Sequence, residues 1–106
     1  MVPVICIDDQ DRPDEIPVEK WVKKGQQYHV IHLFYCHPQQ TNGVVLKEIK
    51  LDDSNYPYES FKFARFAIHP EHIEAFITLM KACTDLNDLD IRTLINEEFE
   101  IQHYND

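Results

Sequence analysis

The chain has 106 residues, of which 43% are hydrophobic, and this fits a single domain, 1–106, with its own core. Only two glycines occur, Gly25 and Gly43, whereas phosphate-binding loops need several glycines close together, so a P-loop or dinucleotide-binding fold is excluded. The net charge of −9 is divided into −4 over residues 1–15, +1 over 16–84 and −6 over 85–106. Such acidic ends disfavour nucleic-acid binding.

Three cysteines, Cys6, Cys36 and Cys83, are widely spaced and lie beside apolar or β-forming residues. This favours reduced thiols that act as small hydrophobic side chains, and the alternative is one disulfide with one free thiol. The N-terminal apolar run has no basic residues before it and ends at Asp8 and Asp9, so no secretory signal is indicated. With no run of membrane-spanning length, we expect a soluble cytoplasmic protein without a membrane partner.

The first two-thirds of the chain reads as short strands separated by turns. Val2–Ile7 is an apolar β-branched run, and the alternation over Gln27–Tyr35 predicts a long strand that starts after a corner at Gly25. The Asn42-Gly43 pair predicts a hairpin turn, because both residues tolerate positive φ, with a return strand over Val44–Leu51. A further strand over Ser60–Ile68 completes the pattern of a small barrel or sandwich.

The last third changes to a helical period. Pro70 suits the first turn of a helix, and Ile73, Phe76, Ile77 and Met80 follow at spacings of three and four residues. A second helix is expected from Asp90, with an apolar staple across its first turn.

Three motifs together resemble a set of uncharacterised small bacterial and phage proteins. These are Trp21–Ile31, with its W-V-K-K-G-x-x-Y-x-V pattern, Pro57–Phe61, and the Arg65-Phe66 pair. The resemblance covers roughly residues 4–66 and implies an SH3-like barrel without a known activity. The expected fold is therefore α+β: a small SH3-like antiparallel β-barrel over 1–68, followed by two C-terminal helices over 70–100.

Metal binding has two candidate regions, and neither has a favourable pattern. The acidic loop Asp8–Glu15 lacks the glycine and distal glutamate of an EF-hand, so a solvated loop is the favoured interpretation. His29 and His32 point to opposite faces of a strand, and Cys36 and His37 lack the paired spacing of structural zinc sites, so His69 or His72 would have to join them. We expect no metal and no cofactor.

Enzymatic chemistry is also disfavoured. Cys83 is the one candidate nucleophile, but its place on the apolar stripe of the first helix predicts an inert, buried thiol. The many carboxylates have no apolar surroundings that would raise a pKa. We therefore expect a protein that is not an enzyme.

The remaining hypothesis is a binding function. Aromatic side chains near the loops either line a peptide groove or close the ends of the barrel. Because no catalytic pattern is found, the leading interpretation is a non-enzymatic protein-interaction module with an unidentified protein partner. One alternative is single-stranded nucleic-acid binding through Lys20–Lys24, where bases flank Trp21; the other is metal binding through the His and Cys residues. The candidate binding residues are Trp21, Lys23, Lys24, Tyr35, Tyr56, Tyr58 and Arg65.

Overall fold

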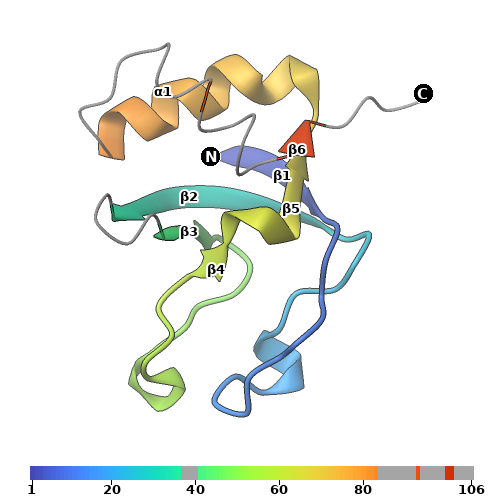
Figure 1. Cartoon of the computed structure of the whole chain (residues 1–106), viewed down its shortest axis with the longest axis vertical. Helices are drawn as coiled ribbons and strands as arrows, with labels where there is room; N and C mark the ends of the chain where they lie inside the picture. Colours follow the sequence, from blue (N-terminus) through green and yellow to red (C-terminus); the bar gives the residue numbers. More distant parts are fainter. Residues whose placement is uncertain (37–40, 84–92, 94–99, 102–106) are drawn as a thin grey trace.

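A curled antiparallel sheet forms the body of the molecule in the computed structural model, which describes residues 1–36, 41–83, 93 and 100–101. Five strands make a half-barrel in the order β4-β3-β2-β1-β5, and a sixth short strand, β6, runs parallel to β5 at the edge (Figure 1). The strands are β1 (Val2–Cys6), β2 (Gln27–Cys36), β3 (Thr41–Leu46), β4 (Phe61–Lys62), β5 (Phe66–Ile68) and β6 (Glu100–Ile101). The predicted α+β class is confirmed at this level, while no sequence pattern indicated β6.

Strand β2 carries a bulge that the alternating pattern did not predict. Val30 pairs with Leu46, but the next pair joins His32 to Val45, so Ile31 is an extra residue in the ladder. An extra residue shifts every following side chain to the other face. Consequently Val30 and Leu33 are both buried, and Ile31 is 46% exposed. The predicted strict alternation from Gln27 to Tyr35 is wrong at this point.

The C-terminal helical segment begins at the predicted proline. The 3-10 turn η4 (Pro70–His72) leads directly into α1 (Ile73–Cys83), which lies over β1 and β2 (Figure 1). Phe76, Ile77 and Met80 are buried, as their spacing predicted. One C-terminal helix is described, not two: apart from Thr93, the range of the expected second helix lies outside the described residues. No helix in the described ranges is long and apolar enough to cross a membrane.

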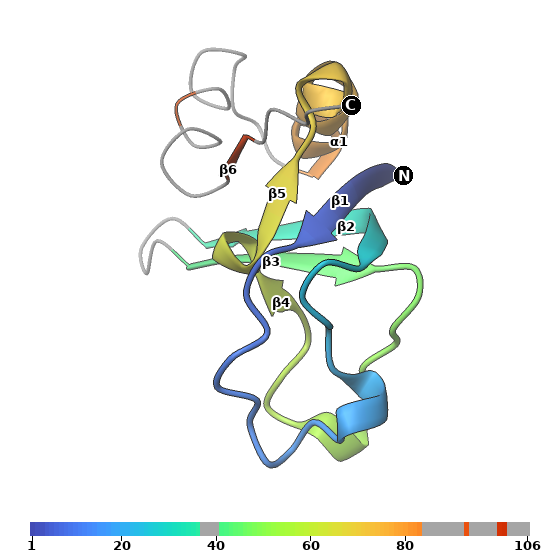
Figure 2. The ribbon, with the colours of Figure 1, turned by 90° about the vertical axis from the view of Figure 1, so that its right-hand side faces the viewer.

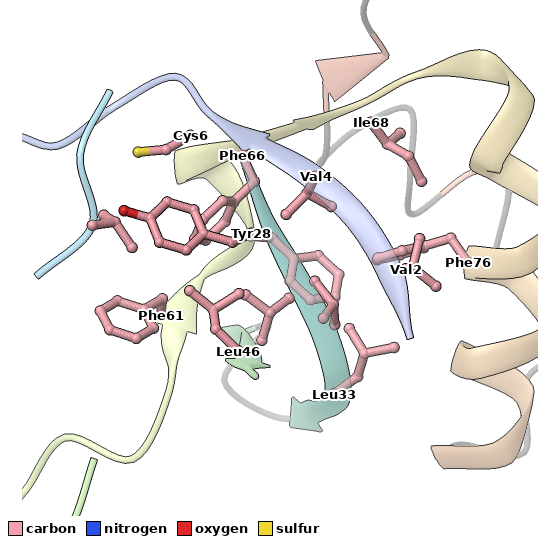
Figure 3. Close-up of a cluster of buried hydrophobic side chains, with 14 of the residues drawn as sticks. Val2, Val4, Cys6, Tyr28, Leu33, Leu46, Phe61, Phe66, Ile68 and Phe76 are labelled. Carbon is pink, nitrogen blue, oxygen red and sulfur yellow. The ribbon is translucent and has the colours of Figure 1, made fainter. Parts of the chain in front are cut away.

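The hydrophobic core fills the concave side of the sheet, beneath α1 (Figure 3). Aromatic side chains link its parts: Phe63 meets Phe76 of α1 edge to face, with ring centroids 6.0 Å apart, and Tyr28 meets Phe66 at 6.4 Å. The predicted strand Ser60–Ile68 is interrupted, because the 3-10 turn η3 (Phe63–Arg65) separates β4 from β5. This turn delivers Phe63 to the core and Arg65 to the opposite loop.

Two long connections form a lobe at the end of the molecule farthest from α1. They contain the 3-10 turns η1 (Val18–Lys20) and η2 (Asp53–Asn55), which lie at the same end of the molecule in both views (Figures 1 and 2). Gly25 ends the first connection with a φ of +88°, and its N–H donates to Cys6 O, which confirms the predicted corner before β2.

The Asn42-Gly43 pair is not the predicted hairpin turn. Both residues lie within β3, where they pair with Tyr35 and Phe34 of β2, and the strand begins at Thr41 and ends at Leu46 instead of spanning Val44–Leu51. Gly43 serves a different purpose: a Cβ at this position would come within 2.8 Å of Ser60 Cβ. The glycine therefore permits the close approach of the Ser60 segment to β3.

We predict that Gly43→Ala lowers the free energy of unfolding by about 2 kcal/mol, because the added methyl group collides with Ser60. The double variant Gly43→Ala, Ser60→Gly should recover part of this loss, which urea denaturation of all the variants measures. Gly25→Ala is the comparison: its Cβ meets nothing within 4 Å, so its cost of about 1 kcal/mol comes from the left-handed backbone and is unchanged by Ser60→Gly. Equal rescue of both glycine variants would contradict the packing explanation.

Candidate functional site

Arg65 fixes the acidic loop that follows β1. Its guanidinium donates to Gln10 O at 2.7 Å and to Asp8 O at 3.4 Å, and it lies 3.7 Å from the Asp8 carboxylate. The residue is only 8% exposed. Because a buried guanidinium needs several acceptors, the loop carbonyls satisfy Arg65 while Arg65 holds the loop.

Trp21 lies directly against this arginine. The Arg65 guanidinium carbon is 4.7 Å from the centre of the Trp21 ring, a distance at which a cation is attracted to the ring face. The indole N–H donates to Asp9 O at 2.7 Å, and the ring packs on Phe61 with centroids 5.8 Å apart. Trp21 is thus fixed from three sides, with part of its surface left open to solvent.

Asn55 joins the two loops of the lobe. It is 1% exposed, and its side-chain amide donates to Glu15 O at 2.9 Å while its carbonyl oxygen accepts from Asp52 N at 3.0 Å. Lys20 adds a second connection, since its ammonium lies 3.0 Å from Asp52 Oδ2 and 3.3 Å from Asn55 Oδ1. The turn at η2 is therefore bound to the first connection by a polar network, in which Asn55 is buried and the Lys20–Asp52 pair is exposed to solvent.

The anchored loops enclose two adjoining pockets that share Tyr58, and we call the pair the aromatic groove. The first has a volume of about 170 Å³ and is lined by Pro13, Trp21, Tyr58 and Phe61, among others. The second, of about 150 Å³, is lined by Leu51, Tyr56, Tyr58 and three acidic residues. The side chain of Tyr58 is partly exposed and belongs to both pockets.

The charge around the aromatic groove is mostly negative. Asp11 lines the first pocket, at a positive φ of 61°, and Asp52, Asp53 and Glu59 line the second. Asp52 is paired with Lys20, but the carboxylates of Asp11, Asp53 and Glu59 have no ion pair within the described part of the chain. Two basic side chains also line the first pocket: Lys62, and Arg65, whose charge is already shared with the acidic loop.

The predicted binding residues divide into two groups. Trp21, Tyr56, Tyr58 and Arg65 come together at the aromatic groove, although Arg65 holds the loop in place and does not present its charge to solvent. Lys23 and Lys24 are exposed and lie outside the groove, and the Lys24 backbone N–H donates to the Asp9 carboxylate. Tyr35 lies in β2 opposite Asn42, and its side chain falls outside the described part of the chain.

Sequence reasoning missed three other residues that build or line the groove: Asn55, Pro13 and Phe61. Asn55 gave a weak signal, because Asp52-x-x-Asn55 matches the spacing of a capping box, and the structure contains one here. The sequence pattern places Pro13 in a loop and Phe61 in a strand. Nothing in their spacing indicates that they lie beside Trp21.

The histidines and cysteines are distributed among separate contacts. His29 Nδ1 lies 2.6 Å from Glu48 Oε2, and His72 Nε2 lies 3.4 Å from Glu71 Oε1. No three His, Cys, Asp or Glu side chains within the described ranges are placed to hold one metal ion. His37 lies outside those ranges, so the metal alternative stays a prediction.

Cys83 differs from its expected environment. It is a free thiol at the end of α1 and is half-buried, not enclosed, and its Sγ lies 3.4 Å from His32 Nδ1. The predicted burial is only partial: Cys83 packs against the core, and part of its surface is exposed beside His32. Cys6, by contrast, is buried, and burial raises the pKa of its thiol.

Comparisons with protein-family models, with curated proteins and with solved structures find no match to this chain. The resemblance to small bacterial and phage proteins is therefore not supported by a family match. What the structure supports is the antiparallel half-barrel, whose strand order is consistent with SH3-like barrel topology.

We predict that Arg65→Ala lowers the free energy of unfolding by about 3 kcal/mol, because it removes the hydrogen bonds to the loop and leaves their carbonyls unsatisfied. Arg65→Lys should recover little of this loss, since an ammonium lacks the planar fork and stacks less well on Trp21. Lys62→Ala, at an exposed neighbouring position, should change stability by less than about 0.5 kcal/mol. Urea denaturation tests all three, and full stability of Arg65→Lys would contradict this role.

The pKa of Asp52 tests the hydrogen bonds that its carboxylate accepts from Ser54 and Lys20. Hydrogen bonds from the Ser54 side chain and from Lys20 lower the pKa of Asp52 from 3.8 to about 2. A lowered pKa means that the carboxylate stabilises the fold above pH 3.8 and that this contribution is lost as the pH falls toward 2. In an NMR titration we expect Asp52 to titrate near pH 2, with Ser54→Ala and Lys20→Gln each raising its pKa. A wild-type midpoint near 3.8 would contradict the network.

Proposed function

We propose that the protein is a non-enzymatic protein-interaction module, built on an SH3-like barrel, which binds an extended peptide segment in the aromatic groove. The observation that carries the proposal is the pair of adjoining pockets that meet at Tyr58. Two pockets in a row suit successive side chains of an extended chain, a recurring mode of peptide recognition.

The rigidity of the groove supports this function. Side chains of Arg65, Trp21 and Asn55 hold the acidic loop at its backbone carbonyls, so the pockets exist before a ligand arrives. Preformed pockets lower the entropic cost of ordering an interface, and this matters for small surfaces such as this one. Partly exposed Tyr and Trp side chains are also the residues that most often act as binding hot spots.

The charge of the groove favours a basic partner. Three carboxylates that have no ion pair in the described ranges, on Asp11, Asp53 and Glu59, surround pockets with apolar walls. A peptide with an aliphatic side chain for the Trp21 pocket and an Arg or Lys for the acidic pocket would satisfy both features. Nothing in the described contacts favours the nucleic-acid alternative: the Lys20 ammonium is paired with Asp52, and the Asp9 carboxylate lies beside the backbone N–H of Lys24.

Trp21 is the sole tryptophan of the chain and lines the groove, so its fluorescence reports directly on binding. As probes we choose an octapeptide of Leu, Pro and Arg, and the same octapeptide with Glu in place of Arg. The Arg peptide should change Trp21 fluorescence saturably, with a Kd of about 10–100 μM, which is typical of a small interface. The Glu peptide should bind at least about tenfold more weakly.

Variants separate the groove from general charge effects. Tyr58→Ala should weaken the Arg peptide about tenfold by removing the side chain shared by both pockets. Asp11→Asn with Asp53→Asn should weaken it and reduce its salt dependence. The matched control is Asp14→Asn with Glu19→Gln, which removes the same charge from exposed sites outside the groove. Equal binding of the two peptides, or equal loss in the control variant, would refute the proposal.

A further inference from the structure

A further pocket, of about 320 Å³, opens where β3 and β4 separate. The ladder between these strands has two pairs, Gly43–Lys62 and Val44–Phe61, and it goes no further. Beyond it, the segment from Val45 forms one wall of the pocket and Glu59–Phe61 forms the other. We call this the lysine pocket, after Lys47 and Lys50 at its rim.

The walls of the lysine pocket are apolar and incompletely covered. Ile31 contributes a side chain that the β2 bulge turns toward solvent, where it is 46% exposed. Val45 and Leu51 are partly exposed in the same pocket, and Ile49 is almost fully buried beneath. Large aliphatic side chains gathered in a concave site are what a ligand with an apolar body would cover.

Two lysine side chains lie at the rim of the lysine pocket. Lys47 and Lys50 are exposed, and neither ammonium has an ion pair or hydrogen bond within the described part of the chain. Glu59 is the one carboxylate in the lining, so the pocket has a local charge of about +1 in a chain of net charge −9. Lysine side chains can lie along an apolar surface and still reach an anion with their ends.

We propose that the lysine pocket binds a small amphipathic carboxylate, with its apolar part against Ile31, Val45 and Leu51 and its anionic end between Lys47 and Lys50. The volume is at the small end of ligand pockets, which suits a short alkyl chain or a single ring. A polyphosphate ligand does not fit, because the site has two lysines and no cluster of glycine N–H groups. The lysine pocket shares Leu51, Glu59, Ser60 and Phe61 with the walls of the aromatic groove. The two lysines that would hold the anionic end do not line the groove, and Tyr58 does not line the lysine pocket.

Octanoate is the probe, followed by amide chemical shifts of the intact chain. We expect saturable shifts at Ile31 and at residues 45–51, with a Kd of about 1 mM or tighter, the affinity expected of a ligand this small. Acetate, which lacks the apolar part, and 1-octanol, which lacks the charge, should give weaker responses at the same residues. Failure to saturate by about 10 mM octanoate, or equal binding of 1-octanol, would overturn the proposal.

Paired substitutions locate the binding. Lys47→Gln with Lys50→Gln should weaken octanoate at least about fivefold, whereas Lys23→Gln with Lys24→Gln removes the same charge elsewhere and should leave its Kd unchanged. Ile31→Thr, at an exposed position that the fold tolerates, should also weaken it. Equal weakening by both lysine pairs would show a non-specific charge effect and refute the site. Loss of peptide binding in Tyr58→Ala with octanoate binding intact would leave this inference standing.

Discussion

The acidic loop after β1 depends on side-chain donors that reach its backbone carbonyls. Arg65, Trp21 and Asn55 bind the carbonyls of Gln10, Asp9 and Glu15, and each comes from a different part of the chain. A loop of this length would otherwise lose its entropy without gaining contacts. Because the donors are buried or partly buried, each of them also needs the loop to satisfy its own polar group. The dependence is mutual, and it makes the lobe a single unit.

This constraint explains why the aromatic side chains form pockets instead of collapsing into the core. The core lies under α1, on the concave side of the sheet, and it is already filled by Phe63, Phe66 and Phe76. Trp21 packs against this core, but its indole N–H is bound to Asp9 and its ring lies under Arg65, so part of the ring stays at the surface. Tyr58 remains at the surface for the related reason that η2 is bound to the loop through Asn55. Polar anchoring thus maintains an apolar surface.

Hydrophobic periodicity correctly predicted the helices and strands whose apolar pattern continues without interruption from end to end. Strand β1 and helix α1 are such cases, since an apolar pattern continues through each and one face is buried. The pattern over Gln27–Tyr35 failed after Val30, because a bulge depends on the partner strand and leaves no mark in the local sequence. Asn42-Gly43 misled for a similar reason: glycine was needed to admit Ser60 from a distant segment, and a dipeptide rule cannot see that neighbour.

The site was harder to predict because the role of a charge depends on what it contacts. The central part of the sequence looked like a weakly basic surface, with eight bases against seven acids over residues 16–84. In the structure, Arg65 is buried in the acidic loop and Lys20 is bound to Asp52, so neither contributes to an open basic patch. Among the other lysines, Lys23 and Lys24 are exposed beside the corner at Gly25, Lys62 lines the aromatic groove, and Lys47 and Lys50 lie beside an apolar pocket. The net charge of this segment is close to zero, but its charged side chains line two surfaces of opposite charge, the aromatic groove and the lysine pocket. Only the fold shows which charged residue belongs to which surface.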